Sequence, residues 1–405
     1  MRPLNPDEPA RLGDFRILRT FRPLPLPDPH GTNHAYSGEG PRALPRVLAL
    51  VAAAVLLLGM GLYSFSALSW APAGIDDTGT DDCSVSERVL PGRLVPPNDP
   101  QVVFPDDVPL ELSFSPDGSI LAVSQIDTVT LWDWERSRVL AQIDHDASAL
   151  PPTPASFSPD GCMVAYGTTH GAVVVDLDSG KRWTVGSDRP VRAVAFSPDG
   201  SSLAVGVRSD PDGRLLHLHD TTTWKLESRL AGSTTLGAIR YSLDGSVVAG
   251  GENGGGVTVW NVDDPRPTGL IRDRAGVGAG AFDLLPDGSG VLIIRSGTVL
   301  LVDPTTEEVV REYVPGADAG VLVDVAYSAA SGRVFAARLD PVTDTGGMVA
   351  WEYGAATEVA LGPDLPRVFP MALSRDGSRV AGLRTGRGDI AVHNTELSLL
   401  GVLAR

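Results

Sequence analysis

The sequence predicts an all-β fold, a seven-bladed β-propeller of four-stranded blades, preceded by one transmembrane helix. Three observations lead to this prediction. A turn resembling Ser-Pro-Asp-Gly recurs seven times after residue 100, apolar strand-like patterns flank each copy, and an uncharged apolar run occupies residues 47–70. No segment after residue 71 shows sustained apolar periodicity of 3.6 residues, so we expect no helix beyond the run.

The composition of the 405 residues agrees with a large folded domain and excludes several classes of protein. Hydrophobic residues make up 42% of the chain, which is enough for a substantial core. The formal net charge of −17 opposes binding to nucleic acid phosphates. Two cysteines exclude a disulfide-dense scaffold and a structural zinc site built from four thiolates.

Residues 1–46 are predicted to form a disordered cytoplasmic tail, because proline-rich sequence up to Pro29 favours extended backbone. Within the tail, residues 11–20 (RLGDFRILRT) resemble the opening strand of bacterial serine/threonine kinase domains. The glycine-rich loop, the lysine strand and the HRD and DFG motifs are missing, so no kinase domain forms. The short match is either a relic of a kinase–propeller fusion or a coincidence.

Residues 47–70 are predicted to cross the cell membrane once. These 24 uncharged residues span about 36 Å as a helix, compared with a hydrocarbon core of about 30 Å. Arg42 and Arg46 precede the run and four aspartates follow it within residues 76–82, so the positive-inside rule places the N-terminus in the cytoplasm and the propeller outside. A signal peptide cleaved near residues 71–73 is the alternative, although the run is longer than a usual signal core.

Residues 71–103 are a predicted linker, and residues 104–405 contain the seven repeats, whose closing glycines are 39 to 45 residues apart. Proline presets φ in such a turn, aspartate bonds its own backbone, and glycine accepts a positive φ. The sixth copy, residues 327–332, is one residue longer and has no aspartate. The other six copies supply the structural turn residues that we predict: Asp117, Gly118, Asp160, Gly161, Asp199, Gly200, Asp244, Gly245, Asp287, Gly288, Asp376 and Gly377.

Each repeat contains four short strand patterns, one before the turn and three after it. The third is rich in β-branched residues and ends in an aromatic or apolar residue followed by a polar one, so we interpret Trp132, Asp133, Trp260 and Trp351 as structural strand ends. Four strands in about 43 residues are typical of a propeller blade, whose two faces are buried only against neighbouring blades. Seven such units fill residues 104–405.

With these motifs, residues 86–405 resemble the WD-repeat and related propeller families, including the TolB-like repeat. The FSPDG turn followed by an apolar strand is shared among them, and the Trp-Asp end of the third strand resembles the WD type. The Gly-His pair of many WD repeats is absent from every copy, and Trp-Asp occurs once, so the internal polar network of that family does not carry over. The resemblance implies a propeller fold, and together with the apolar run it indicates a membrane-anchored bacterial member of these families.

Two segments compete for the edge at which the ring closes. Residues 397–403 fit the outer strand of the seventh blade, and residues 88–95 form a second strand-like segment. An unpaired edge promotes aggregation, so one of the two is expected to cover it.

Few residues form a pattern that points to chemistry. His217 and His219 share one face of a strand, a spacing that metal sites use, but His219 and His393 stand where other repeats have tryptophan, which favours a core position. His145 and His170 fall in loops without neighbouring ligands. The aspartate-rich loops at residues 209–213 and 340–347 lack the EF-hand ligand array. We therefore predict no catalytic residue, no cofactor and no metal site.

Cys83 lies shortly beyond the apolar run, and Cys162 follows the second turn. In an oxidising compartment these two residues either form a disulfide that joins the linker to a blade or remain as one buried and one free thiol.

These features predict a membrane-anchored, non-catalytic scaffold that binds a protein or peptide outside the membrane. A propeller presents loops from seven blades on a stiff frame, and phosphate-loop, nucleophile-elbow and zinc-helix motifs are absent. The negative charge favours a basic partner and excludes nucleic acid. Two alternatives stay open: an enzyme with a site at the mouth of the central channel, which a cluster of buried carboxylates there would favour, and a sensor linked to kinase signalling.

Overall fold

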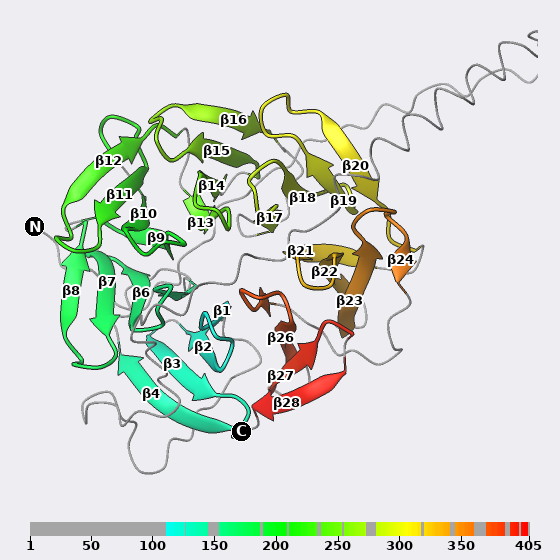
Figure 1. The fold of residues 1–405 in the computed structure, drawn as a ribbon, viewed down its shortest axis with the longest axis horizontal. Helices are drawn as coiled ribbons and strands as arrows, with labels where there is room; N and C mark the ends of the chain where they lie inside the picture. Colours follow the sequence, from blue (N-terminus) through cyan, green and yellow to red (C-terminus); the bar gives the residue numbers. More distant parts are fainter. Residues whose placement is uncertain are drawn as a thin grey trace, which may run out of the picture. The chain divides into compact units, whose positions relative to one another are not determined.

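The computed structural model describes residues 111–403, except residues 126, 145–153, 187–188, 209, 233–235, 253–254, 273–280, 317–319, 341–344, 360–369, 385–388 and 397. The described residues belong to the second of two compact units of the chain, Met1–Asp76 and Asp77–Arg405. Within them, 28 strands form seven four-stranded antiparallel sheets, which surround a central axis (Figure 1). The predicted all-β, seven-bladed propeller of four-stranded blades is confirmed.

Each blade consists of four strands that are consecutive in the chain, with the first nearest the axis. Blades 1 and 2 contain β1 (Glu111–Phe114), β2 (Ile120–Ser124), β3 (Thr128–Asp133), β4 (Arg138–Asp144), β5 (Ser156–Phe157), β6 (Met163–Thr168), β7 (Gly171–Asp176) and β8 (Arg182–Val185). Blades 3 to 5 contain β9 (Val191–Phe196), β10 (Ser202–Val207), β11 (Leu216–Asp220), β12 (Leu226–Leu230), β13 (Leu236–Tyr241), β14 (Val247–Glu252), β15 (Val257–Asn261), β16 (Pro267–Ile271), β17 (Phe282–Leu284), β18 (Val291–Arg295), β19 (Thr298–Val302) and β20 (Val309–Tyr313). Blades 6 and 7 contain β21 (Val321–Ser328), β22 (Arg333–Asp340), β23 (Thr345–Glu352), β24 (Glu358–Val359), β25 (Met371–Leu373), β26 (Arg379–Arg384), β27 (Asp389–Asn394) and β28 (Leu399–Leu403).

The inner strands bury both of their faces because alternate side chains pack against different blades. In β9, Val194 and Phe196 join the apolar cluster shared with blade 2, whereas Ala193 and Ala195 join the cluster that contains Trp260 of blade 4. Each blade therefore completes the core of two neighbours, and small residues on one face let the blades approach near the axis.

The turns after the inner strands are built from local hydrogen bonds. In the first turn, the Ser115 hydroxyl donates to Asp117 Oδ1 at 2.5 Å, and the Gly118 amide donates to the Ser115 carbonyl at 2.8 Å. Gly118 has a φ of 69°, a conformation that L side chains rarely adopt, and the closing glycines of the other copies also have positive φ. In the copy without aspartate, the Ser328 hydroxyl instead donates to the carbonyl of Gly377 in the next blade at 2.6 Å.

The outer edge of the seventh blade is formed by β28, which pairs with β27. Of the two segments predicted to compete for this edge, the C-terminal one occupies it, and residues 88–95 lie outside the described residues. The joint between blades 7 and 1 is a shared apolar cluster that includes Leu403 and Trp134. Arg379 of blade 7 lies 5.6 Å from the ring of Trp134, whose indole N–H donates to the Gly118 carbonyl at 2.7 Å.

Large side chains at the ends of the third strands pack against the preceding blade. The indole N–H groups of Trp260 and Trp351 donate to the carbonyls of Ala231 (2.8 Å) and Val314 (3.3 Å), which follow the last strand of the blade before. His219 occupies the corresponding register position and is buried. Trp132 and Asp133 are also buried, and Asp133 accepts a 2.9 Å bond from the Arg136 guanidinium.

The predicted segments that precede the first blade lie outside the described residues: the tail 1–46, the span 47–70, the linker 71–103 and the first residues of the predicted domain 104–405. In the described ranges of residues 111–403, no helix is long and apolar enough to cross a membrane. The transmembrane helix and its orientation therefore stay predictions.

Candidate functional site

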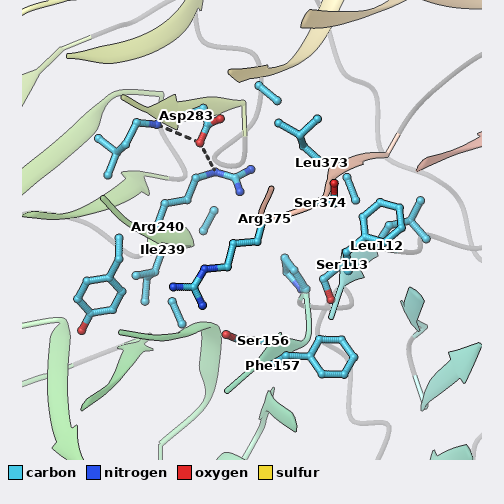
Figure 2. Close-up of a pocket in the computed structure, with 18 of the residues that line it drawn as sticks. Leu112, Ser113, Ser156, Phe157, Ile239, Arg240, Asp283, Leu373, Ser374 and Arg375 are labelled. Carbon is cyan, nitrogen blue, oxygen red and sulfur yellow. Dashed lines mark hydrogen bonds and ion pairs between the residues drawn. The ribbon is translucent and has the colours of Figure 1, made fainter. Parts of the chain in front are cut away.

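The inner strands of the seven blades surround a cavity of about 710 Å³ on the axis of the ring. All seven blades contribute lining residues. The volume lies within the range of about 300–1,000 Å³ that is usual for ligand pockets. The cavity is the candidate functional site, and Figure 2 shows part of its lining.

One mouth of the cavity is formed by the turns that follow the inner strands. The turn residue before each aspartate, or its counterpart, lines the cavity, which gives a mainly apolar rim: Pro116, Pro159, Pro198, Leu243, Pro286, Ala329 and Arg375. Arg375 is the charged member of this set. Its guanidinium donates to the Pro198 carbonyl at 3.3 Å, so it reaches from blade 7 to blade 3 across the mouth.

Polar side chains on the inner strands connect each of several blades to the next. An inner strand has one edge without a strand partner, so its backbone groups need other partners. The chain provides them at four joints: the Phe196 amide donates to Ser156 Oγ (3.0 Å), Arg240 Nε donates to the Phe282 carbonyl (2.8 Å), the Tyr327 amide donates to Asp283 Oδ2 (2.8 Å), and the Met371 amide donates to Asp324 Oδ2 (3.3 Å). These bonds hold the charged groups of Arg240, Asp283 and Asp324 in fixed positions.

Three carboxyl groups line the cavity together with the guanidinium groups of Arg192, Arg240 and Arg375. Arg240 Nε lies 3.8 Å from Asp283 Oδ1, and Figure 2 shows the two side chains beside each other. Burial raises the pKa of Asp324 to about 7, assisted by the charge of Asp283, while Arg240 and two backbone amides oppose the rise. Burial and the charge of Asp324 likewise raise the pKa of Glu111 to about 7. Burial also raises the pKa of Asp283.

Arg192 enters the cavity from a β-bulge in the inner strand of blade 3. The strand pairing passes from Val191 directly to Ala193, so Arg192 has no opposite residue. The same shift leaves Gly237 in blade 4 and Val323 in blade 6 without a partner, and all three skipped residues line the cavity. Bulges commonly redirect a side chain in this way.

Three buried polar atoms of the cavity lining have no hydrogen-bond partner among the described residues. They are Nε of Arg192, Oγ of Ser113 and Oη of Tyr241. A buried donor without a partner costs about 1–3 kcal/mol, and such exceptions are few in folded proteins. These atoms are therefore positions where a bound molecule or water can complete the hydrogen bonding.

The residues singled out from the sequence mostly lie away from this cavity. Of the predicted turn residues only Gly377 lines it, and the strand-end residues do not. Sequence reasoning missed the charged lining: Glu111, Arg192, Arg240, Asp283, Asp324 and Arg375. The sequence did contain a signal for them. Each of these charged residues interrupts an apolar pattern and stands within about five residues of a turn or in the turn itself.

Of the two neighbouring histidines of blade 3, His217 lies beside the buried carboxylate of Asp210, whereas His219 Nδ1 lies 3.4 Å from the Trp224 carbonyl. Asp210 accepts a 2.6 Å bond from the Arg189 guanidinium, and His217 Nε2 lies 3.4 Å from the same carboxylate oxygen. Burial lowers the pKa of both His217 and His219. Among the residues that the structure describes, no group of three or more histidine, cysteine, aspartate or glutamate side chains is arranged to hold a metal ion.

The remaining candidates from the sequence lie partly outside the described residues. Cys162 is disulfide-bonded, and the described chain contains no free cysteine. Cys83 is outside the described residues, so the pairing of Cys83 with Cys162 stays a prediction. His145 is also outside them, and His170 Nδ1 shares a 2.9 Å hydrogen bond with the hydroxyl of Thr169.

Comparison with known proteins supports the propeller fold and does not assign the chain to a family. No protein-family profile matches the chain, and no curated protein matches it. Among solved structures, the chain is similar to one of Kuenenia stuttgartiensis hydrazine synthase, with a TM-score of 0.56 and 16% sequence identity, over 72% of this chain and 97% of that chain. At this identity the similarity supports the propeller fold alone.

Proposed function

We propose that the protein is a membrane-anchored, WD-repeat-like propeller that binds a peptide or a peptide segment of a protein partner outside the membrane, without catalysis. The observation that carries the proposal is the cavity of about 710 Å³ on the ring axis. An apolar rim, fixed interior charges and contributions from every blade are properties of a preformed binding site.

The carboxyl groups of the cavity favour binding over catalysis because most of them already accept hydrogen bonds from the backbone of a neighbouring blade. Asp283 and Asp324 accept backbone N–H groups of the following blade. Three serines of the lining donate their hydroxyls to a carboxylate, but each does so to the aspartate of its own turn: Ser197, Ser242 and Ser374. The charged groups of the cavity are therefore better explained as groups that recognise a ligand.

One observation favours an enzyme as the second candidate. The sequence analysis named a cluster of buried carboxylates at the channel as the feature that would indicate catalysis, and Glu111 and Asp324 form part of such a cluster. With a pKa of about 7, each is suited to accept and donate protons near neutral pH. The third alternative, a sensor linked to kinase signalling, depends on residues 1–46, which lie outside the described residues.

The test of binding uses the full chain in detergent micelles and a library of random tetrapeptides. Peptides that bind are titrated calorimetrically against the wild type and against Val323→Trp, which adds bulk at a bulge position inside the cavity. The control is Val310→Trp on the exposed outer strand of blade 5. We expect Val323→Trp to weaken binding about tenfold or more and Val310→Trp to leave it unchanged, because only the first blocks the cavity. Equal affinity for all three proteins would show that the peptides bind elsewhere.

The proposed location outside the membrane is supported by Cys162, because persistent disulfides are typical of oxidising compartments. The chain has only one other cysteine, Cys83, so we expect one intramolecular bond. Mass spectrometry of a tryptic digest of the full chain, alkylated without reduction, should show a peptide pair that contains both residues. Alkylation of both cysteines in the unreduced protein would contradict this expectation.

A further inference from the structure

We propose that the cavity recognises its peptide through two opposite charges, a carboxylate bound on the guanidinium side and a cationic group bound on the carboxyl side. This inference rests on the proposed function and deepens it by naming the chemistry of the ligand. It follows from three observations: where the charged residues lie, which of them already bond to a neighbouring blade, and which buried donors lack a partner.

The charged groups of the lining are divided between different blades. Arg192 belongs to blade 3, and Arg375 reaches from blade 7 to the turn of that same blade. Asp324 and Glu111 belong to blades 6 and 1, and both line the cavity. The cavity therefore has a basic side at blade 3 and an acidic side between blades 6 and 1.

Arg240 and Asp283 already form an ion pair, and each also hydrogen-bonds to the backbone of the next blade. The guanidinium of Arg240 lies 3.8 Å from the carboxylate of Asp283 and donates to the Phe282 carbonyl. The carboxylate accepts the amide of Tyr327 from the next blade. A ligand therefore has Arg192 available on one side. On the other side it has Glu111 and the charge of Asp324, whose carboxylate already accepts the amides of Val325 and Met371.

The basic side lacks an acceptor. Nε of Arg192 is buried without a hydrogen-bond partner among the described residues. A guanidinium group has the geometry to bind a carboxylate through two parallel hydrogen bonds. A ligand carboxylate would supply the acceptor that Arg192 needs, and the bulge already directs the side chain into the cavity.

Among the described residues, the acidic side has fewer cations than carboxyl groups, because the charge of Arg240 alone acts on Glu111, Asp283 and Asp324. Asp324 is only 8% exposed, and its charge adds to burial in raising the pKa of Glu111. A cation between two carboxyl groups removes this repulsion and stabilises both in the charged form. Ammonium and guanidinium groups of peptides meet this requirement, and a cavity of about 710 Å³ has room for a few residues between the two charges.

The test uses three matched peptides titrated into the full chain in detergent micelles. Acetyl-Lys-Ala-Ala carries one cation and one carboxylate, its C-terminal amide lacks the carboxylate, and acetyl-norleucine-Ala-Ala lacks the cation. We expect removal of either charge to weaken binding about tenfold or more. At pH 7 we also expect the parent peptide to release protons from the protein, measured as a difference in heat between buffers of different ionisation enthalpy.

Protein variants then assign each charge to its side of the cavity. In Arg192→Met, acetyl-Lys-Ala-Ala and its C-terminal amide should bind with equal affinity, and removal of the lysine cation should still weaken binding. In Asp324→Asn, the preference for lysine over norleucine should shrink, and removal of the C-terminal carboxylate should still weaken binding. Arg266→Met removes a guanidinium whose side chain is 83% exposed and should change neither preference.

The outcomes separate this inference from the proposed function. If Val323→Trp blocks peptide binding but the three matched peptides bind equally, or none of them binds while other peptides do, the two-charge inference is wrong and the binding function stands. If Val323→Trp has no effect on any peptide, the cavity is not the binding site and both proposals fail.

Discussion

At the scale of single residues, the turn aspartates stabilise the blades through bonds within one turn. Asp199 accepts the Ser197 hydroxyl at 2.5 Å and the Ser201 amide at 3.0 Å, and these bonds hold its pKa below the usual value. Because the bonds are local, the sequence motif identifies the residue and its role together. The structure places the same pair of bonds at Asp117 and Asp244.

We predict that Asp199→Ala lowers the free energy of unfolding by about 1 kcal/mol at neutral pH, the usual contribution of such hydrogen bonds. The folded-state pKa is depressed, so the difference from wild type should be full above the pKa of the unfolded chain. It should vanish as the pH falls through the lower folded value. Denaturant unfolding of the full chain at several pH values measures it.

Asp212→Ala is the matched control for this substitution. Its side chain is 68% exposed and its one ion pair spans 3.9 Å, so we expect a change within about 0.5 kcal/mol. Equal effects of the two substitutions would mean that the turn bonds contribute nothing beyond surface charge.

At the scale of strands and blades, the closure of the ring depends on side-chain packing. Each described blade consists of four strands consecutive in the chain, and β28 lies in the same sheet as β25, β26 and β27. The contact between blades 7 and 1 is the apolar cluster around Leu403, Ile390 and Trp134. A hydrogen bond from the Ser137 hydroxyl to the Val402 carbonyl at 2.9 Å adds to it.

We predict that Leu403→Ala destabilises the protein by about 2–5 kcal/mol, the usual cost of truncating a buried leucine. Leu403 is fully buried, whereas Leu400 in the same strand is 48% exposed. Leu400→Ala should therefore change the stability by less than about 0.5 kcal/mol. Thermal unfolding of both variants in the full chain is the measurement, and a shift of similar size in both would show that the cluster does not hold the ring closed.

The difference between contacts within one repeat and contacts between repeats explains which features could be predicted from the sequence. The repeat spacing and turn chemistry specify the blade number and strand order because both depend on neighbours within one repeat. The cavity depends on contacts between repeats: Tyr327 and Asp283 are 44 positions apart, and Pro198 and Arg375 are 177 apart. The polar residues of the inner strands were visible in the sequence, but which of them meet at the axis follows only from the closed ring.

At the scale of the whole molecule, the cavity links stability to pH. Burial raises the pKa of Glu111 and Asp324 to about 7, so the folded protein binds more protons than the unfolded chain between their ordinary values and about 7. Stability from these groups is therefore greatest at low pH and is lost as the pH rises through this window. His217 and His219 act in the opposite direction below their ordinary pKa, because burial keeps them neutral in the folded state.

The substitution Asp324→Asn isolates the contribution of the cavity. An asparagine oxygen can still accept the Met371 amide, but it carries no charge at any pH. Relative to wild type, the variant should therefore gain stability as the pH rises from about 5 to about 8, since it escapes the cost of a buried negative charge beside Glu111 and Asp283. Chemical unfolding across this range measures the difference, with Asp212→Asn as the exposed control. The histidines are unchanged in all three proteins, so their contribution cancels; parallel stability curves for wild type and Asp324→Asn would contradict the assignment of a raised pKa to this carboxyl group.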